Sequence, residues 1–406
     1  MKILFVTHAF PRHTADAAGS FLLGLAVALR QRGAHVSVIA PAGPGLAAEE
    51  SIGGIAVRRF RYAPAAMETL AYSGTMAEQV RESIGGLLAL AGMLALGRSA
   101  VRRARQRLTP DVVHAHWWFP AGLIARSQPG RTALVTTLHG TDVRLAADSG
   151  IGRRLFRYVA RGSDRVTAVS SWLAERAAAA CEGLAPEVVP MPVDTLLFVP
   201  PAPGSRRSGV LFVGRLNAQK GAADLVRAFA RVNAPSHLDI VGDGPDAAAA
   251  RALALELGVG DRVHFHGALP HDALPAHYQR AAVVVVPSRD EGLGLAAVEA
   301  QLCGTPVIAY DSGGLRDVVR HRETGMLVAP GDIDAIANAI DPMLGDPDTA
   351  TRFAEQARRE ALQRFAPDAV ASRFLGIYEQ AIEAAARRAG PARAQGVARD
   401  RGDAGG

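Results

Sequence analysis

Short runs of β-branched and apolar residues alternate with helix-length segments along almost the whole chain. Two of these runs, residues 209–213 and 283–286, are apolar at consecutive positions rather than at every second one. Because a continuously apolar strand buries both of its faces, such runs are typical of a parallel sheet covered by helices on two sides. The pattern therefore predicts an α/β fold of doubly wound parallel sheets. The expected strands are residues 2–7, 35–40, 55–60, 111–115, 132–138, 165–169, 209–213, 237–241, 262–266, 282–287, 306–310 and 326–328.

The 406 residues are too many for one ordinary core and suit two domains. Residues 200–209, which are rich in Pro, Gly and Ser, read as a linker between two Rossmann-like domains facing across a cleft. Ligands of such sheets bind beyond the carboxyl ends of the strands, so we expect the site in that cleft. The expected parts are an N-terminal domain over 1–200, a C-terminal domain over 201–366, a helix over 367–385 that packs back on the N-terminal domain, and a disordered tail over 386–406.

Composition narrows the class of protein. Only two cysteines are present, which excludes a disulfide scaffold and a Cys-based zinc cluster and fits a reducing compartment. Residues 2–7 read as a first strand rather than a signal peptide, and no apolar run of about 18 residues predicts a spanning helix, so we expect a cytoplasmic protein. The net charge is +6, but 43 of the 45 basic residues are arginine, which indicates a compositional bias. No aromatic-basic motif predicts nucleic-acid binding.

An uncharged stretch, residues 84–97, leads into five arginines between positions 98 and 107. An apolar segment followed by a basic one is typical of a helix at an anionic membrane surface, so segment 84–107 is a candidate peripheral membrane contact on the inner face of the membrane. The alternative is a helix buried against the first sheet with a solvated far end. We favour the second interpretation, because 14 residues are too few to span a bilayer.

The segment 283–310 carries the clearest chemical signal. An apolar strand ends near Ser288, Gly292 and Gly294 open a helix, and Gly304 is placed as its left-handed cap. The amino end of that helix then lies at the carboxyl end of a parallel strand, where its free N–H groups favour an anion such as a phosphate. The glycines allow the backbone to approach the phosphate closely.

Two glutamates frame this helix, Glu291 in the turn and Glu299 within the helix. A diphosphate at the helix end would leave an attached ribose about 6–9 Å along the axis, where the Glu299 carboxylate can accept hydrogen bonds from its hydroxyls. Glu291 would face the group carried beyond the phosphates. The alternative for Glu299 is a surface glutamate, but the apolar residues around it indicate a buried helix.

Residues 213–221 supply two cations at the end of another strand. Arg215 and Lys220 follow Gly214 and precede the next helix, so a planar guanidinium and a compact ammonium can together hold two phosphates. The alternative is a pair of solvated loop charges.

Together these stretches resemble the retaining nucleotide-sugar glycosyltransferases of the two-domain GT-B type with the E-x7-E signature, also called glycosyltransferase family 4 or glycosyl transferases group 1. The resemblance runs to about residue 385, and Leu293 stands where the family usually has Phe. The residues that match its C-terminal motifs are Gly214, Arg215, Leu216, Lys220, Gly221, Gly242 within 241–245, Glu291, Gly292, Leu293, Gly294, Leu295, Glu299 and Ala300.

The N-terminal half resembles the acceptor domain of the same family. His139, Gly140 and Asp142 match its His-Gly-x-Asp motif, which implies that His139 lies near the donor sugar. Gly19 is the counterpart of a first-loop glycine that contacts the diphosphate. His114 and His116 are expected to be structural, and Trp117 and Trp118 to line an acceptor path or the core.

The resemblance implies transfer of a sugar from a nucleoside-diphosphate sugar to an acceptor hydroxyl with retention of configuration, in cell-envelope, polysaccharide or glycolipid synthesis. His139, Glu291, Arg215 and Lys220 are then the catalytic candidates, and the amides of Gly294 and Leu295 add to the charge stabilisation. No cofactor and no metal are expected. The pairs Asp332/Asp334 and Asp346/Asp348 resemble a metal-binding DxD motif but lie in surface sequence and receive no role.

Three other functions are open. A glycoside hydrolase could use Glu291 and Glu299 as acid and base, but two carboxylates along one helix do not face each other across a sugar. A membrane-surface nucleotide-binding protein would use segment 84–107 and leave the donor motifs unexplained. Another GT-B enzyme, such as a sugar-nucleotide epimerase, would convert the donor without an acceptor.

Overall fold

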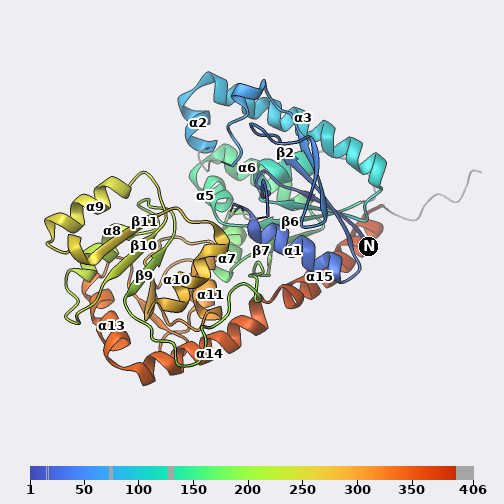
Figure 1. The fold of residues 1–406 in the computed structure, drawn as a ribbon. Helices are drawn as coiled ribbons and strands as arrows, with labels where there is room; N and C mark the ends of the chain where they lie inside the picture. Colours follow the sequence, from blue (N-terminus) through green and yellow to red (C-terminus); the bar gives the residue numbers. More distant parts are fainter. Residues whose placement is uncertain (15, 17, 73–75, 127–131, 390–406) are drawn as a thin grey trace, which may run out of the picture.

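The computed structural model describes residues 1–389 except 15, 17, 73–75 and 127–131. The chain forms two lobes, each built on a parallel sheet (Figure 1). The N-terminal sheet has the order β3-β4-β2-β1-β5-β6-β7-β8 and the C-terminal sheet the order β11-β10-β9-β12-β13-β14, and β3 pairs antiparallel with β4. The fold class predicted from the alternating pattern is confirmed.

The strands of the N-terminal sheet are β1 (Lys2–Val6), β2 (His35–Pro41), β3 (Glu49–Ile52), β4 (Ile55–Phe60), β5 (Val112–His116), β6 (Ala133–Leu138), β7 (Arg165–Ala168) and β8 (Glu187–Val188). Its helices are α1 (Ser20–Gln31), α2 (Met76–Glu82), α3 (Ile84–Leu108), α4 (Leu123–Arg126), α5 (Thr141–Asp148), α6 (Gly150–Gly162) and α7 (Ser171–Ala180). The helices α3 and α4 cover one face of this sheet, and α1 and α15 cover the other.

The strands of the C-terminal sheet are β9 (Val210–Val213), β10 (Leu238–Val241), β11 (Val263–Gly267), β12 (Val283–Val286), β13 (Val307–Tyr310) and β14 (Met326–Val328). Its helices are α8 (Ala222–Phe229), α9 (Ala247–Glu256), α10 (Leu274–Arg280), α11 (Leu295–Leu302), α12 (Leu315–Val318) and α13 (Ile333–Gly345). In β12, Val283 and Val285 pack towards α8 and α13, whereas Val284 and Val286 pack towards α11. The continuous apolar run is therefore buried on both faces.

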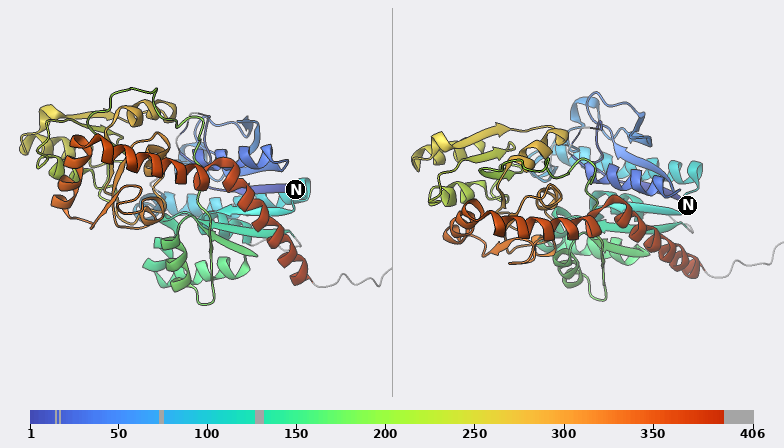
Figure 2. Two further views of the ribbon diagram at one scale, coloured as in Figure 1. Left: turned by 90° about the horizontal axis from the view of Figure 1, so that it is seen from below. Right: turned by 60° about the horizontal axis from the view of Figure 1, so that its bottom comes forward.

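Two consecutive helices, α14 (Pro347–Phe365) and α15 (Pro367–Ala389), run from the C-terminal lobe to the N-terminal one (Figure 2). α15 packs against α1 and β6, and Arg32 Nε lies 2.6 Å from Asp368 Oδ1. The helix extends to Ala389, so the tail predicted to begin at 386 is helical over its first residues. Residues 390–406 lie outside the described part of the chain.

Helix α3 packs against the sheet on one face, as the favoured prediction has it, and exposes large apolar residues on the other. Its buried face combines Met93 and Val101 with small residues such as Ala89, whereas Ile84 is 79% and Leu88 is 62% exposed. By length and composition alone, α3 is also long enough and apolar enough to cross a membrane. The prediction of a helix against the first sheet is therefore correct, and the exposed apolar residues of its first turns are a feature that this prediction did not include.

Candidate active site

The loop after β9 brings Arg215 and Lys220 to the carboxyl edge of the C-terminal sheet. A Cβ on Gly242 would lie only 1.9 Å from the Gly214 carbonyl oxygen, so this backbone contact between the ends of β9 and β10 requires glycine. Gly221 adopts a φ of 72° as the N-cap of α8, and the Lys220 N–H donates to Asn217 Oδ1 at 3.1 Å. The Lys220 side chain is thereby held at the start of α8.

The loop between β12 and α11 meets the N-terminal domain directly. A Cβ on Gly292 would lie 2.2 Å from the His139 carbonyl oxygen, and a Cβ on Gly140 would lie 3.2 Å from Gly292 Cα. Gly294 has a φ of 95° and is the N-cap of α11, as the sequence predicts, and Gly304 has a φ of 67° after its end. The carboxyl edges of the two sheets therefore meet at His139 and Gly292.

Lys220 and Glu291 form an ion pair at this junction. Lys220 Nζ lies 2.7 Å from Glu291 Oε2, and the two side chains are 29% and 15% exposed. Arg215 is exposed and makes no side-chain hydrogen bond or ion pair to the residues that the structure describes. The structure thus brings together an ammonium, a carboxylate and, on the same loop as Lys220, an unpaired guanidinium.

Glu299 is buried within α11 and is 8% exposed. The Tyr278 hydroxyl donates to its Oε2 at 2.8 Å, and His271 Nε2 lies 3.3 Å from its Oε1. The hydrogen bond to Glu299 raises the pKa of His271. Sequence reasoning missed Tyr278 and His271, because neither belongs to a motif and they lie in different elements, Tyr278 in α10 and His271 in the 3-10 turn before it.

His139 is held from its backbone and from its ring. Asp142 Oδ1 accepts hydrogen bonds from the N–H groups of His139 and Gly140 at 3.2 and 2.9 Å. His139 Nε2 lies 3.2 Å from His116 Nδ1, and the ring centroids of His139 and Trp117 are 4.3 Å apart. Burial lowers the pKa of His139 well below its usual range, so the imidazole is neutral near pH 7.

The structure also shows where three other residues singled out in the sequence lie: His114, His116 and Trp118. His114 Nε2 lies 2.6 Å from Thr137 Oγ1 and its Nδ1 lies 2.8 Å from the Tyr378 hydroxyl, so the structural role predicted for His114 fits its position. His116, by contrast, contacts the candidate residue His139 directly. Trp118 is fully buried, which places it in the core rather than on an acceptor path.

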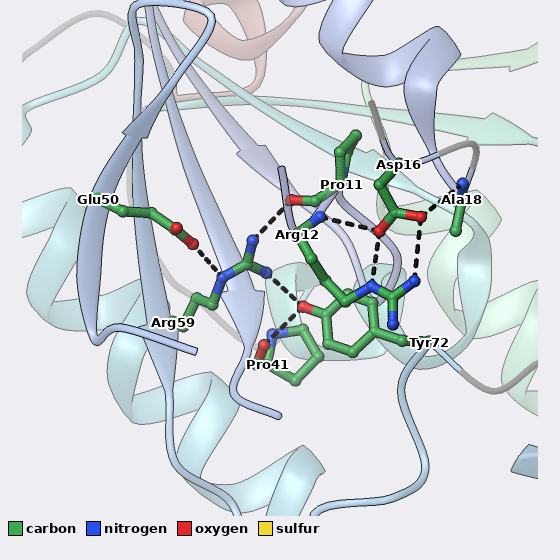
Figure 3. A network of polar contacts seen from close by, with 8 residues as sticks. All are labelled: Pro11, Arg12, Asp16, Ala18, Pro41, Glu50, Arg59 and Tyr72. Carbon is green, nitrogen blue, oxygen red and sulfur yellow. Dashed lines mark hydrogen bonds and ion pairs between the residues drawn. The ribbon is translucent and has the colours of Figure 1, made fainter. Parts of the chain in front are cut away.

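A polar network holds the loop that precedes Gly19, and Figure 3 shows this network around Arg12 and Arg59. Gly19 has a φ of 76°, and a Cβ there would lie 2.6 Å from the Ala9 carbonyl oxygen. Within this loop, Arg12 Nε lies 2.7 Å from Asp16 Oδ2. The buried Arg59 donates to the Pro11 carbonyl at 2.6 Å and to the Tyr72 hydroxyl, and it pairs with Glu50. The network fixes the loop that precedes Gly19.

The two DxD-like pairs lie at helix ends. The Asp332 side chain accepts from Ala335 N–H at the start of α13, and Asp346 accepts from Thr349 N–H at the start of α14. Asp332 and Asp346 are therefore the N-caps of these helices. Among the described residues, no group of three or more His, Cys, Asp or Glu side chains could hold a metal ion.

Comparison with known proteins finds a glycosyltransferase family model for each half of the chain. Residues 200–360 match the family "Glycosyl transferases group 1" and residues 18–196 match "Glycosyltransferase Family 4". The chain is 36% identical over 322 residues to a D-inositol 3-phosphate glycosyltransferase of Acidothermus cellulolyticus, covering 70% of this chain and 71% of that protein. It is 32% identical to a GDP-mannose-dependent alpha-(1-6)-phosphatidylinositol monomannoside mannosyltransferase of Mycobacterium tuberculosis, covering 67% and 77%.

Solved structures show the same architecture. Sucrose-phosphate synthase from Thermosynechococcus elongatus superposes with a TM-score of 0.78 at 26% identity, over 95% of this chain and 100% of that one. HepE of Anabaena in complex with UDP superposes with a TM-score of 0.72 at 22% identity, over 93% and 100%, which supports the fold alone. The chain therefore belongs to the GT-B glycosyltransferases of the group 1 and family 4 type, and it is a transferase.

Proposed function

We propose that this protein transfers a sugar from a nucleoside-diphosphate sugar to an acceptor hydroxyl with retention of anomeric configuration. The observation that carries the proposal is the ion pair of Lys220 with Glu291, which lies beside the backbone contact of His139 with Gly292. A cation, a carboxylate and a neutral imidazole at the meeting edges of two parallel sheets suit a diphosphate that carries a sugar.

The cations act on the leaving group. When the bond from the sugar C1 to the diphosphate oxygen breaks, negative charge grows on the diphosphate while the sugar becomes oxocarbenium-like. The Lys220 ammonium and the exposed Arg215 guanidinium stabilise that charge, together with the N–H groups at Gly294 and Leu295. We propose that these groups suffice without a metal ion or a cofactor.

The remaining groups position the donor. Glu299, which Tyr278 holds through its hydroxyl, accepts hydrogen bonds from the ribose hydroxyls. Glu291 and the neutral His139 face the sugar. The acceptor hydroxyl approaches C1 on the face from which the diphosphate leaves, and its proton passes to the leaving phosphate oxygen. Configuration at C1 is then retained.

For the acceptor, we propose a glycolipid or another cell-envelope glycan, on the cytoplasmic side of the membrane. The two relatives named above act, by their names, on inositol 3-phosphate and on a phosphatidylinositol monomannoside. The outer face of α3 supports a peripheral membrane contact. Ile84, Leu87 and Leu88 are exposed in the first turns of this helix, which lie towards the carboxyl edge of the sheet.

A panel of nucleoside-diphosphate sugars tests the proposal. Thermal shift identifies the donor that binds, slow hydrolysis of that donor shows that the bond to C1 breaks, and NMR of the product with inositol-type acceptors reads the anomeric configuration. Inversion at C1 would contradict the mechanism. Conversion of the donor to an isomeric nucleotide sugar with no acceptor present would favour the epimerase alternative instead.

A further inference from the structure

A cavity of about 300 Å³ lies at the amino edge of the N-terminal sheet, away from the candidate active site. It adjoins the start of β6, at Ala133 and Leu134. His139 follows the other end of the same strand, which places it roughly 20 Å away at about 3.3 Å per residue. No acidic residue is among the described residues that line the cavity, and four of them are arginines: Arg105, Arg126, Arg161 and Arg388.

The Arg126 guanidinium is fixed in place without a carboxylate. Its Nε donates to the Tyr158 carbonyl at 3.4 Å, and its plane lies over the Tyr158 ring with 4.8 Å between Cζ and the ring centroid. Its side chain also occupies the space that Gly162 leaves, since a Cβ there would lie 1.4 Å from Arg126 Nε. A guanidinium held in this way leaves its terminal N–H groups available to a ligand.

The other arginines add charge that the surrounding protein neutralises only in part. Arg388, on the last turn of α15, lies 2.7 Å from the buried carboxylate of Asp164. Arg161, on the last turn of α6, makes no side-chain hydrogen bond or ion pair to the residues that the structure describes. Arg105 on α3 is half-buried, and burial lowers its pKa. Among the described residues, an ion pair with a carboxylate is formed by Arg388 and by neither Arg126 nor Arg161.

Helix dipoles explain part of this arrangement. Arg105, Arg161 and Arg388 lie in the last turns of their helices, where cations interact favourably with the carboxyl end of the helix. Each helix end attracts its own cation independently, however, so this effect does not require the guanidinium groups to share one cavity. Four like charges around a common space repel each other, and a bound anion removes that repulsion.

We propose that this cavity is a second anion site, remote from the donor site, that binds a compact polyanion carrying two phosphate groups. A planar guanidinium binds phosphate oxygens in pairs, so several arginines around one cavity suit a ligand with two phosphate groups. The shared chemistry is that of a diphosphate, whether it is free in solution or part of a lipid headgroup.

Calorimetry with inorganic pyrophosphate tests the site. Because pyrophosphate can also enter the donor site, the titration uses the full chain with Lys220→Ala as background. We expect saturable binding of one pyrophosphate, weakened at least tenfold by Arg161→Gln and weakened further by added salt. Arg154→Gln, at an exposed arginine on the same helix, is the matched control and should leave binding unchanged.

Thermal melting separates binding from folding. Arg161 has no described side-chain partner and only the favourable end of α6 beside it, so Arg161→Gln should change the melting temperature without anion only slightly and should remove the stabilisation by pyrophosphate. Vesicles with a diphosphate-bearing headgroup distinguish the source: if they displace pyrophosphate the ligand is a headgroup, and if they do not it is a free polyanion. Absence of saturable binding in the millimolar range, or equal binding by Arg161→Gln and the background protein, overturns the proposal.

Discussion

Replacing Lys220 separates the charge of this residue from its shape. Lys220 Nζ lies 2.7 Å from Glu291 Oε2, and its stem passes over Gly214, with Cδ 3.8 Å from the place where a Cβ on that glycine would lie. An ammonium is a compact charge that fits between two phosphates and a carboxylate, whereas a guanidinium is broad and planar. We therefore expect Lys220→Arg to keep the fold and to lose most of the transferase activity.

The magnitudes follow from the environment of the pair. Its side chains are 29% and 15% exposed, so Lys220→Ala should cost at most about 1 kcal/mol of folding free energy. Loss of a group that stabilises charge in the transition state typically costs about 2.7–4 kcal/mol, so kcat/KM of Lys220→Ala should fall by roughly 100- to 1,000-fold. Lys220→Arg retains the charge, and we expect a loss of at least about tenfold, or 1.4 kcal/mol.

The assay compares kcat/KM of the wild type and both variants with one donor. Arg227→Lys on the adjacent helix α8 is the control for a basic exchange at an ion pair, because Arg227 Nη1 lies 3.6 Å from Asp224 Oδ1 outside the site. It should leave activity unchanged. If Lys220→Arg stays within about threefold of the wild type, the shape of the lysine contributes well under 1 kcal/mol and the reasoning is refuted.

Four further outcomes are expected. Glu299→Gln should weaken donor affinity by about ten- to a hundredfold, the cost of one charge-assisted hydrogen bond; unchanged affinity in calorimetry would exclude the contact with the ribose. The bond to Glu299 raises the pKa of His271, so its contribution to stability is complete below the ordinary histidine pKa of 6.5 and is lost as pH rises through the raised value; the difference in unfolding free energy between the wild type and His271→Gln should therefore be larger at about pH 5.5 than at about pH 8.5. EDTA should leave transfer intact, and loss of activity restored by Mg²⁺ or Mn²⁺ would contradict the proposed charge stabilisation. Leu87→Glu with Leu88→Glu should abolish sedimentation with anionic vesicles while soluble-acceptor kinetics stay unchanged.

The donor-site motifs were predictable because their signals are local. Gly294 and Gly304 adopt left-handed conformations that favour glycine, and they bracket an eight-residue helix where the sequence placed one. Lys220 and Glu291 were assigned to one site from their motifs, and the structure joins them at 2.7 Å. Tyr278 and His271 could not be assigned, because they reach Glu299 from 21 and 28 residues away without any local pattern.

Helix α3 shows what the apolar stretch alone left open. The sequence predicted a helix against the first sheet, but it did not specify which residues of the helix face inwards. A Cβ on Gly92 would lie 2.1 Å from the Tyr62 carbonyl oxygen, and one on Gly97 would lie 2.8 Å from Ile124 Cδ1. Close packing therefore selects the small-residue face and turns Leu87 outwards.

The histidines of the N-terminal sheet depend on contacts that only the tertiary fold creates. Tyr378 on α15 reaches His114 across 264 positions of sequence, and the His114 and His116 ring centroids are 3.9 Å apart. His116 Nδ1 in turn contacts His139 Nε2, and the Asp142 carboxylate accepts a hydrogen bond from the His139 N–H. Because Nε2 of His139 contacts His116, Nδ1 is the ring nitrogen that the proposed function leaves to a substrate. The motif identified His139, but the contact of its ring with His116 arises from the pairing of β5 with β6.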